Sequence, residues 1–269
     1  MRRIARTHNK GPIPPAYGQM TLIDNPWFYA LAIPALILNG ISKGGLGGGV
    51  GSASVPMMAL VIPPSQAAAI MLPILCVMDL PAIHSYFGRW DKAQMRIIIP
   101  AGLLGIVVGT LTFRYLNESW LRILLGIISI GFVLNSVRRK NPGAAPPTPA
   151  KGWFWCSLSG YTSFVAHSGG PPLTVYLLPQ KLEKTVFVAT SVIFFSVGNY
   201  LKIAPYVWLG LFDTRNLATS AVLFPVGIVG VYLGVWLHRR LSQALFYRIV
   251  YVLLLATGAK LLYDGLTRL

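Results

Sequence analysis

A glycine-rich stretch that follows a lysine is the first part of the sequence whose residue types suggest chemistry. Six of the eight residues from 44 to 51 are glycines, and Lys43 stands directly before them. Successive backbone N–H groups in such a turn form a concavity suited to an anion, and the positive end of a following helix adds to the attraction. The stretch predicts an anion site whose candidates are Lys43, Gly47, Gly48, Gly49 and Ser52.

A second glycine stretch, with a histidine before it, follows later in the chain. It reads HSGGPP from 167 to 172, and a proline suits the first turn of a new helix because an N–H at that position would have no helical partner. His167, Ser168, Gly169 and Gly170 then lie at the anion-attracting end of that helix. We treat His167 as a candidate for substrate contact or proton relay, the alternative being a structural histidine.

Three polar residues interrupt apolar tracts. Asp79 lies inside AAIMLPILCVMDLPAIHSYF, and Asn199 and Lys202 lie inside VATSVIFFSVGNYLK. An ionisable residue inside a membrane is energetically expensive and is therefore a candidate for function. We expect Asp79 to carry a proton or to pair with Lys43, and Asn199 and Lys202 to lie near the substrate. The alternatives are that Asp79 faces water at a helix end and that both lysines extend to the membrane surface.

The composition predicts that these residues are held by membrane helices. Only 11% of the 269 residues are charged and 54% are hydrophobic, whereas a soluble domain has about a quarter of its residues charged. Residues 44 to 78 and 216 to 237 contain no charge, and a span needs about 20 residues. The net charge of +16 does not indicate a nucleic-acid partner, because long apolar tracts separate the basic residues. The expected partner is the lipid bilayer.

Uncharged runs bounded by charges or by proline and glycine clusters define the candidate membrane segments. Two of them, 51 to 63 and 170 to 180, follow the glycine stretches and are about half as long as a spanning helix. We interpret them as half-helices or re-entrant hairpins, whose backbone groups need protein or a water-filled cavity as partners. The others lie near residues 27 to 42, 66 to 88, 97 to 115, 120 to 137, 152 to 166, 185 to 207, 216 to 237 and 243 to 262.

An internal repeat is predicted from a proline and glycine pattern. PxGxxGxxxG occurs once in each half, as Pro100, Gly102, Gly105 and Gly109 and again as Pro225, Gly227, Gly230 and Gly234. The pattern predicts an all-α polytopic integral membrane protein with two homologous repeats of about four spanning helices each and glycine-rich broken helices. The GxxxG spacing inside each copy favours close helix packing rather than substrate contact.

The boundaries of the repeats follow from a polar, proline-rich segment. Residues 138 to 151 hold four prolines and four basic residues and cannot continue a helix. We therefore expect a mobile basic tail at 1–24, a first membrane repeat at 25–137, a linker at 138–151 and a second repeat at 152–269. The positive-inside rule would place tail and linker together in the cytoplasm and make the repeats parallel, but further basic groups conflict with it. Parallel and inverted repeats both stay open.

No signature of catalysis or of a cofactor is present. The four histidines are scattered, and HExxH, paired carboxylates and a phosphate loop are absent from the sequence. Cys76 and Cys156 lie in apolar tracts and form neither a disulfide framework nor a zinc spacing. We expect no enzyme activity, no metal and no cofactor.

The order of these motifs resembles that of the TauE/SafE family of sulfite-exporter-like permeases, also called toluene sulfonate uptake permeases. The resemblance rests on GGLGGGVGS, AAAIMLPI and WDKAQMRIIIPAGLLGIVVG in the first half, and on HSGGPPLTVYLLPQ, VATSVIFFSVGNYLK and FPVGIVGVYLGVWLHRRL in the second. In the commoner family pattern both halves carry GGG, and this chain departs from it with HSGGPP. The resemblance implies a multi-pass inner-membrane permease for sulfite, sulfonates or related organosulfur anions.

We therefore expect a secondary transporter that moves a small anion, sulfite or an organosulfur anion such as a sulfonate, by alternating access between the two repeats. Coupling to protons through Asp79 or His167 is part of this hypothesis. The alternatives are a carrier for a carboxylate or a metal ion, a membrane-embedded enzyme, and an assembly partner. The direction of transport, the coupling ion and the oligomeric state are not determined by these residues.

Overall fold

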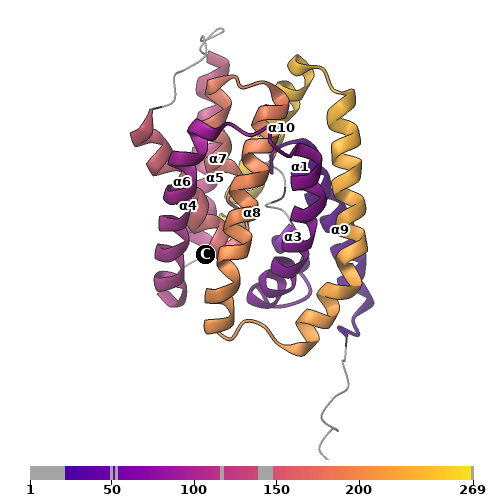
Figure 1. Cartoon of the computed structure of the whole chain (residues 1–269). Coiled ribbons are helices and arrows are strands. Elements are labelled where there is room, and N and C mark those ends of the chain that lie inside the picture. Colours follow the sequence, from indigo (N-terminus) through magenta and orange to yellow (C-terminus); the bar gives the residue numbers. More distant parts are fainter. Residues whose placement is uncertain (1–21, 49–50, 52–53, 116–117, 139–147, 268–269) are drawn as a thin grey trace, which may run out of the picture.

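The chain folds into a bundle of helices (Figure 1). The computed structural model describes residues 22–48, 51, 54–115, 118–138 and 148–267, and none of these residues lies in a β-strand. The predicted tail at 1–24 and linker at 138–151 fall largely outside this range. The α-helices are α1 (Pro26–Gly45), α2 (Ser54–Met58), α3 (Pro64–Tyr86), α4 (Lys92–Thr112), α5 (Glu118–Arg138), α6 (Pro149–Ala166), α7 (Gly170–Leu177), α8 (Lys184–Trp208), α9 (Thr214–Arg240) and α10 (Gln243–Thr267).

Five of these helices are long and apolar enough to cross a membrane, namely α3, α4, α8, α9 and α10. The prediction of an all-helical, polytopic membrane protein is confirmed, whereas its division into two repeats of about four spanning helices each stays a prediction. The helices coincide closely with the candidate segments predicted from uncharged runs, except that segment 51 to 63 contains only the five-residue α2.

Acidic residues fix the starts of three long helices. The carboxylates of Asp91, Glu183 and Asp213 accept hydrogen bonds from backbone N–H groups in the first turns of α4, α8 and α9. Burial raises the pKa of the Glu183 carboxyl, but hydrogen bonds from Thr185 and Val186 outweigh burial and lower that pKa overall. Three of the seven acidic residues are thus used as helix caps rather than in the membrane interior.

The first glycine stretch breaks the chain after α1. Gly47 and Gly48 have φ angles of 73° and 83°, a left-handed conformation that glycine adopts without steric cost. Beyond this turn the chain runs back along α1, since Asn39 Nδ2 donates to Gly51 O at 2.9 Å and Ser54 Oγ donates to Ala35 O at 3.0 Å.

The second break has the same form. His167 ends α6 in the left-handed region with φ of 49°, and α7 begins three residues later at Gly170. Ser159 Oγ donates to Gly169 O at 2.6 Å, so the chain again returns along the helix it has left. The prediction of helix breaks at both glycine-rich stretches is confirmed.

Glycines allow two pairs of helices to pack closely. A Cβ atom on Gly234 of α9 would lie 2.6 Å from Ile41 O of α1, and one on Gly105 of α4 would overlap Ser157 O of α6. Backbone atoms cannot move aside as a flexible side chain can, so these positions accept only glycine at this helix separation. The packing interpretation of the GxxxG motifs is confirmed.

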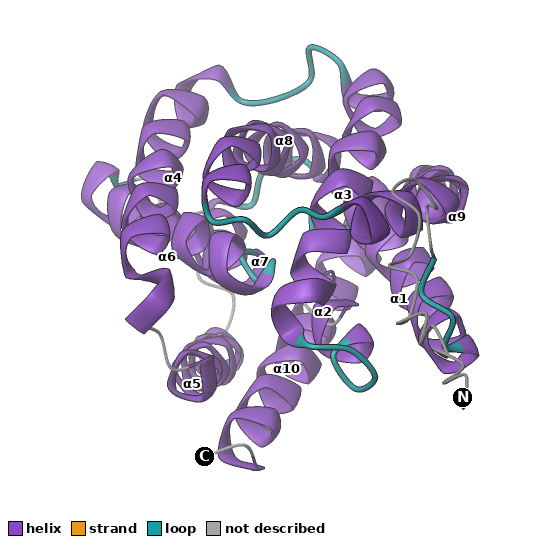
Figure 2. Ribbon diagram, turned by 90° about the horizontal axis from the view of Figure 1, so that it is seen from below, coloured by secondary structure: helices purple, strands orange, loops and turns teal. Residues whose placement is uncertain are grey.

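These packed pairs lie on opposite sides of the bundle (Figure 2). Helices α1 and α9 form one side, α4 and α6 the other, α5 packs with α10, and α3, α7 and α8 lie between them. Helices α1, α3 and α9 run in one direction. The contacts that fix this direction are Ile37 with Gly230, Ile41 with Gly234, Gln66 with Asn216, and Ile70 with Ser220.

Helices α4, α6 and α8 run in the opposite direction. Antiparallel contacts join α3 to α8, because Asp79 contacts Asn199 whereas Asp91, just after α3, contacts Thr190. Parallel contacts then join α8 to α4 and α4 to α6. They are Phe194 with Gly102, Gly198 with Ile106, Gly160 with Gly102, and Phe164 with Gly109. Consequently α6 begins at the end of the bundle opposite to the start of α1.

Candidate functional site

A buried ion pair joins α1 to α3. Lys43 Nζ lies 2.6 Å from Asp79 Oδ1 and also donates to Leu75 O at 3.1 Å. Lys43 is 6% exposed and Asp79 is fully buried. The pairing of Asp79 with Lys43 is confirmed, and the alternatives in which Lys43 extends to the membrane surface and Asp79 faces water are wrong. Burial favours the pair because an unpaired charge in this apolar interior is costly.

Helix α8 completes the partners of the carboxylate. Asn199 Nδ2 donates to Asp79 Oδ2 at 2.9 Å, and Ser196 Oγ donates to Asp79 Oδ1. Three donors from two helices therefore surround a single carboxylate. Both oxygens of this buried carboxylate therefore have hydrogen-bonding partners, as burial of a polar group requires.

A second buried lysine lies on α8. Lys202 is fully buried, and its Nζ lies 3.1 Å from each of Ser163 O, Ser163 Oγ and His167 Nδ1. An ammonium group has three donors and no acceptor, so Nδ1 of His167 accepts and the imidazole carries its proton on Nε2. That proton points to Ala68 O, 3.1 Å away. The alternative in which Lys202 extends to the membrane surface is thus wrong. Its Nζ instead contacts the Nδ1 side of the His167 ring.

The cluster contains more basic than acidic side chains. It has two lysines, Lys43 and Lys202, and one carboxylate, that of Asp79. Of the other acidic residues, three cap helices, Asp24 precedes α1, Asp264 pairs with Lys260 on α10, and Glu118 begins α5. Among the acidic side chains that the structure describes, Asp79 alone belongs to this interior cluster.

A cavity of about 40 Å³ lies against this cluster, which is room for about three water-sized groups. Five predicted site residues line it, and each half of the chain contributes to its wall. They are Lys43, Gly48, His167, Gly170 and Asn199. The structure thus brings the two glycine-rich breaks to one cavity, although their role in binding stays a prediction.

Three other predicted residues lie beside the cavity rather than in its wall. Ser168 Oγ donates to Ala166 O at 3.1 Å, and Gly169 O accepts from Ser159. Gly47 packs against the ring of Phe187. These residues shape the turns, and their predicted contact with substrate stays untested. The remaining two predicted residues, Gly49 and Ser52, lie outside the described residues.

One backbone N–H group of the first break is already used inside the protein. The N–H group of Gly48 donates to Ser42 O at 3.0 Å. Helix α2, which follows the break, has only five residues and so supplies little dipole. The expectation of a cradle of free N–H groups therefore does not hold at Gly48.

Sequence reasoning missed several residues of the site. Asn39, Ser163 and Phe195 line the cavity, Ser196 donates to Asp79, and Tyr206 OH lies 3.5 Å from His167 Nε2. A periodic signal was available, because Ser196, Asn199 and Lys202 follow one another at three-residue spacing in an apolar helix. Such spacing places polar side chains on neighbouring positions of one helical face.

Metal-ligand residues do not gather anywhere in the described part of the chain, where no group of three histidine, cysteine or acidic side chains could hold an ion.

The family model described as sulfite exporter TauE/SafE matches residues 32–261. The chain belongs to this family.

Two relatives of this chain are named as an exporter and as a transporter. The probable sulfite/organosulfonate exporter TauE of Cupriavidus necator is 24% identical over 188 residues, which cover 67% of this chain and 73% of that protein. The probable inner membrane transporter protein TsaS of Comamonas testosteroni is 26% identical over 198 residues, which cover 70% of this chain and 81% of that protein. No solved structure gives a significant match.

The TauE/SafE assignment and the apolar helices establish the general class of the protein. It is a multi-pass transporter of the inner membrane and not an enzyme. The resemblance noted from the sequence motifs is confirmed.

Proposed function

We propose that this TauE/SafE protein is a secondary transporter of a small anion, sulfite or an organosulfonate. The observation that carries the proposal is the buried cluster of two ammonium groups and one carboxylate beside the cavity. A buried excess of positive charge is costly unless an anion compensates it. The curated relative named as a sulfite/organosulfonate exporter supports this class of anion.

In this proposal the anion enters the cavity and meets Lys43 and His167 at its wall. Lys43 already pairs with Asp79, so the anion competes with that carboxylate for the ammonium group. Lys202 does not line the cavity, and its charge acts through His167, which it holds by a hydrogen bond to Nδ1. His167 then presents Nε2–H, which exchanges Ala68 O for an oxygen of the anion.

Proton coupling through Asp79 belongs to the same proposal. Protonation of Asp79 removes the competing negative charge and leaves Lys43 free for the anion. A proton that enters with the anion would therefore leave the site close to its original charge. His167 is a poorer proton carrier in this state, because its Nδ1 already accepts from Lys202.

Alternating access between two inverted repeats would expose the cavity to each side of the membrane in turn. What supports the repeat is a set of features that recur 120 residues apart in opposite orientation. Gly47 and His167 both have positive φ angles at the ends of α1 and α6. The hydrogen bond from Gly48 N–H to Ser42 O recurs, 120 residues later, as the one from Ser168 N–H to Thr162 O. At the same offset, Ser163 corresponds to Lys43 and Asn199 to Asp79.

Transport by purified protein in proteoliposomes tests the proposal. We expect uptake of sulfite or of at least one sulfonate from a panel of sulfite, thiosulfate, sulfoacetate, taurine and acetate. Uptake of none of the sulfur anions above the level of protein-free vesicles would contradict it. A preference for acetate would assign the site to carboxylates.

Three lysine variants connect transport to the cluster. Lys43→Ala removes a charge-assisted contact worth about 1.5 to 3 kcal/mol, so anion affinity should fall ten- to a hundred-fold. Lys202→Met should lower affinity as well, because it removes the excess charge. The matched control is Lys260→Met on α10, whose ammonium forms an ion pair with Asp264 four residues away and is 60% exposed. Loss of affinity in all three variants would deny the cluster a specific role.

A further inference from the structure

The ring of Phe195 lies between the two glycine-rich breaks. A Cβ atom added to Gly48 would lie 2.8 Å from Cε2 of this ring, and one added to Gly169 would lie 3.0 Å from Cε1. Phe195 therefore touches a turn from each half of the chain with opposite parts of one aromatic ring. Both turns leave room for the ring because neither position carries a side chain.

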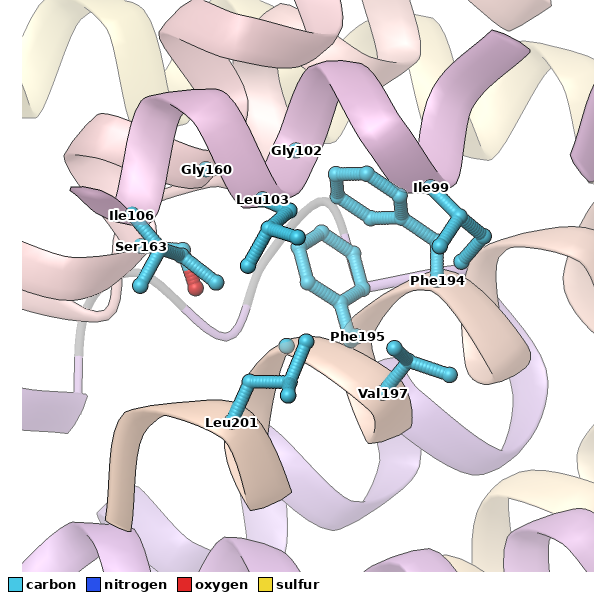
Figure 3. A pocket seen from close by; sticks show the side chains of 11 residues that line it. Ile99, Gly102, Leu103, Ile106, Gly160, Ser163, Phe194, Phe195, Val197 and Leu201 are labelled. Atoms are coloured by element: carbon cyan, nitrogen blue, oxygen red, sulfur yellow. The ribbon is translucent and has the colours of Figure 1, made fainter. Parts of the chain in front are cut away.

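A second hollow lies on the other side of this ring, between α4, α6 and α8 (Figure 3). Its wall is almost entirely apolar and includes Ile99, Ile106, Val197 and Gly198. Leu103 and Leu201 line its mouth, and each is 42% exposed on the outer surface of the bundle. We call it the apolar groove.

The apolar groove and the polar cavity meet at two residues. Phe195 and Ser163 line both hollows, and every other residue of the apolar groove lines that hollow alone. Ser163 is held in place because its hydroxyl and its carbonyl both accept from Lys202. Phe195 makes no hydrogen bond through its side chain, so of the two shared residues it alone is held in place only by packing.

We propose that the ring of Phe195 is the barrier between the polar cavity and the apolar groove, and that it limits the size of the apolar group on the transported anion. The inference rests on the proposed anion transport. Sulfite has no apolar group and fits the cavity with the ring in place. An organosulfonate that binds with its charged head at Lys43 and His167 has its apolar part directed at this ring. Its tail reaches the apolar groove only when the ring moves, because the groove by itself has a volume of only about 10 Å³.

Phe194 provides a matched control for this role. It is the preceding residue of α8, its ring lies 5.2 Å from that of Phe195 between centroids, and it lines the apolar groove. It does not line the polar cavity. Removal of its ring enlarges the apolar groove without opening the wall that Phe195 closes.

The first experiment tests the barrier without any transported anion. Gly198→Cys places a thiol in the apolar groove, where a Cβ atom meets only Ile106 Cδ1 at 3.6 Å, an ordinary contact. Cys76→Ala and Cys156→Ala remove the two native thiols, which are both buried. A membrane-impermeant, anionic thiosulfonate reagent should modify this thiol at least ten-fold faster after Phe195→Ala than in the parent. Phe194→Ala should leave the rate unchanged.

Equal labelling in the Phe195→Ala and Phe194→Ala variants, or no increase in either, would overturn the barrier. Because Phe195→Ala removes a half-buried ring, Phe195→Leu serves as a second variant that retains apolar volume. It should give an intermediate labelling rate. Native melting behaviour in detergent shows which variants are folded.

The second experiment tests the size limit. In proteoliposomes, Phe195→Ala should raise the ratio of benzenesulfonate to sulfite transport at least five-fold, and Phe194→Ala should leave the ratio unchanged. Faster labelling without any change in this ratio would overturn the size limit. If the unmodified protein transports neither anion, the proposed function fails, whereas the labelling experiment still decides whether Phe195 separates the two hollows.

Discussion

At the scale of single residues, the two buried lysines of the site differ in whether a carboxylate faces them. Lys43 has a carboxylate partner in Asp79, whereas Lys202 contacts only the neutral acceptors of Ser163 and His167. The carboxylate holds Lys43 in place when no anion is present. In the proposed function, Lys202 is the basic group without a carboxylate partner and therefore the one whose charge an anion would balance.

Replacement of the Asp79 carboxylate tests its contribution to stability separately from its competition with an anion for Lys43. Asp79→Asn leaves Lys43 buried without a counter-charge, so the free energy of unfolding should fall by about 3–5 kcal/mol. The same change removes the competitor for Lys43, so added sulfite should raise the melting temperature of the variant more than that of the unmodified protein. Thermal denaturation in detergent with and without sulfite measures both effects. The double variant Lys43→Met with Asp79→Asn should recover part of the stability, and a single variant that melts at the original temperature contradicts the ion pair.

The backbone conformation of His167 allows its effect on stability to be separated from its effect on anion affinity. Its φ of 49° is uncommon for residues other than glycine, but asparagine tolerates it. His167→Asn should melt near the original temperature while anion affinity falls about ten-fold, because a hydrogen bond to a charged ligand is lost. His167→Ala should lose stability in addition. Unchanged affinity in a folded His167→Asn variant would remove this side chain from the binding site.

At the scale of elements, close packing of helices depends on which glycine faces a neighbouring backbone. Gly105 and Gly198 both lie inside helices, yet a Cβ atom would overlap Ser157 O at Gly105 and would meet only a side-chain methyl group at Gly198. The same residue type therefore has a strict steric role at one position and little role at the other.

Alanine at these two positions provides a matched test. Gly105→Ala should lower the free energy of unfolding by about 1–3 kcal/mol through overpacking of α4 against α6. Gly198→Ala should be neutral or stabilising by up to about 1 kcal/mol, because alanine favours helix over glycine. Melting temperature and purified yield measure both, and Gly105→Leu or Gly230→Leu should give larger losses. A folded Gly105→Leu variant with altered substrate preference would place this glycine in the binding site instead.

At the scale of the whole molecule, the directions of the helices place the starts of α1 and α6 at opposite ends of the bundle. Asp24 precedes α1 at one end, close to Arg215 at the start of α9, and Thr148 precedes α6 at the other. The positive-inside rule alone would place the flanking basic segments together. If the two halves are the proposed repeats, this helix direction makes them inverted rather than parallel.

Labelling of exposed cysteines tests this arrangement in the membrane. Asp24→Cys and Thr148→Cys, each in the variant without native cysteines, should react with an impermeant maleimide from opposite sides of the membrane. Right-side-out and inside-out vesicles give opposite labelling patterns if the arrangement is correct. Reaction of both positions from the same side would contradict the inverted arrangement.

The sequence by itself determined the class of the protein, the positions of the helices and the places where they break. Uncharged tracts, the glycine runs and HSGGPP are local features, and local features suffice because a bilayer requires each segment to satisfy its own backbone hydrogen bonds. The partners of the buried charges needed the tertiary structure. Lys43 and Asp79 are 36 positions apart and Asp79 and Asn199 are 120 apart, and only packing of α1, α3 and α8 shows that they meet. In the sequence, a lysine that extends to the membrane surface looks the same as one that pairs inside the protein, because both stand in an apolar tract. The structure decides between them: a buried carboxylate lies beside Lys43 and a histidine lies beside Lys202.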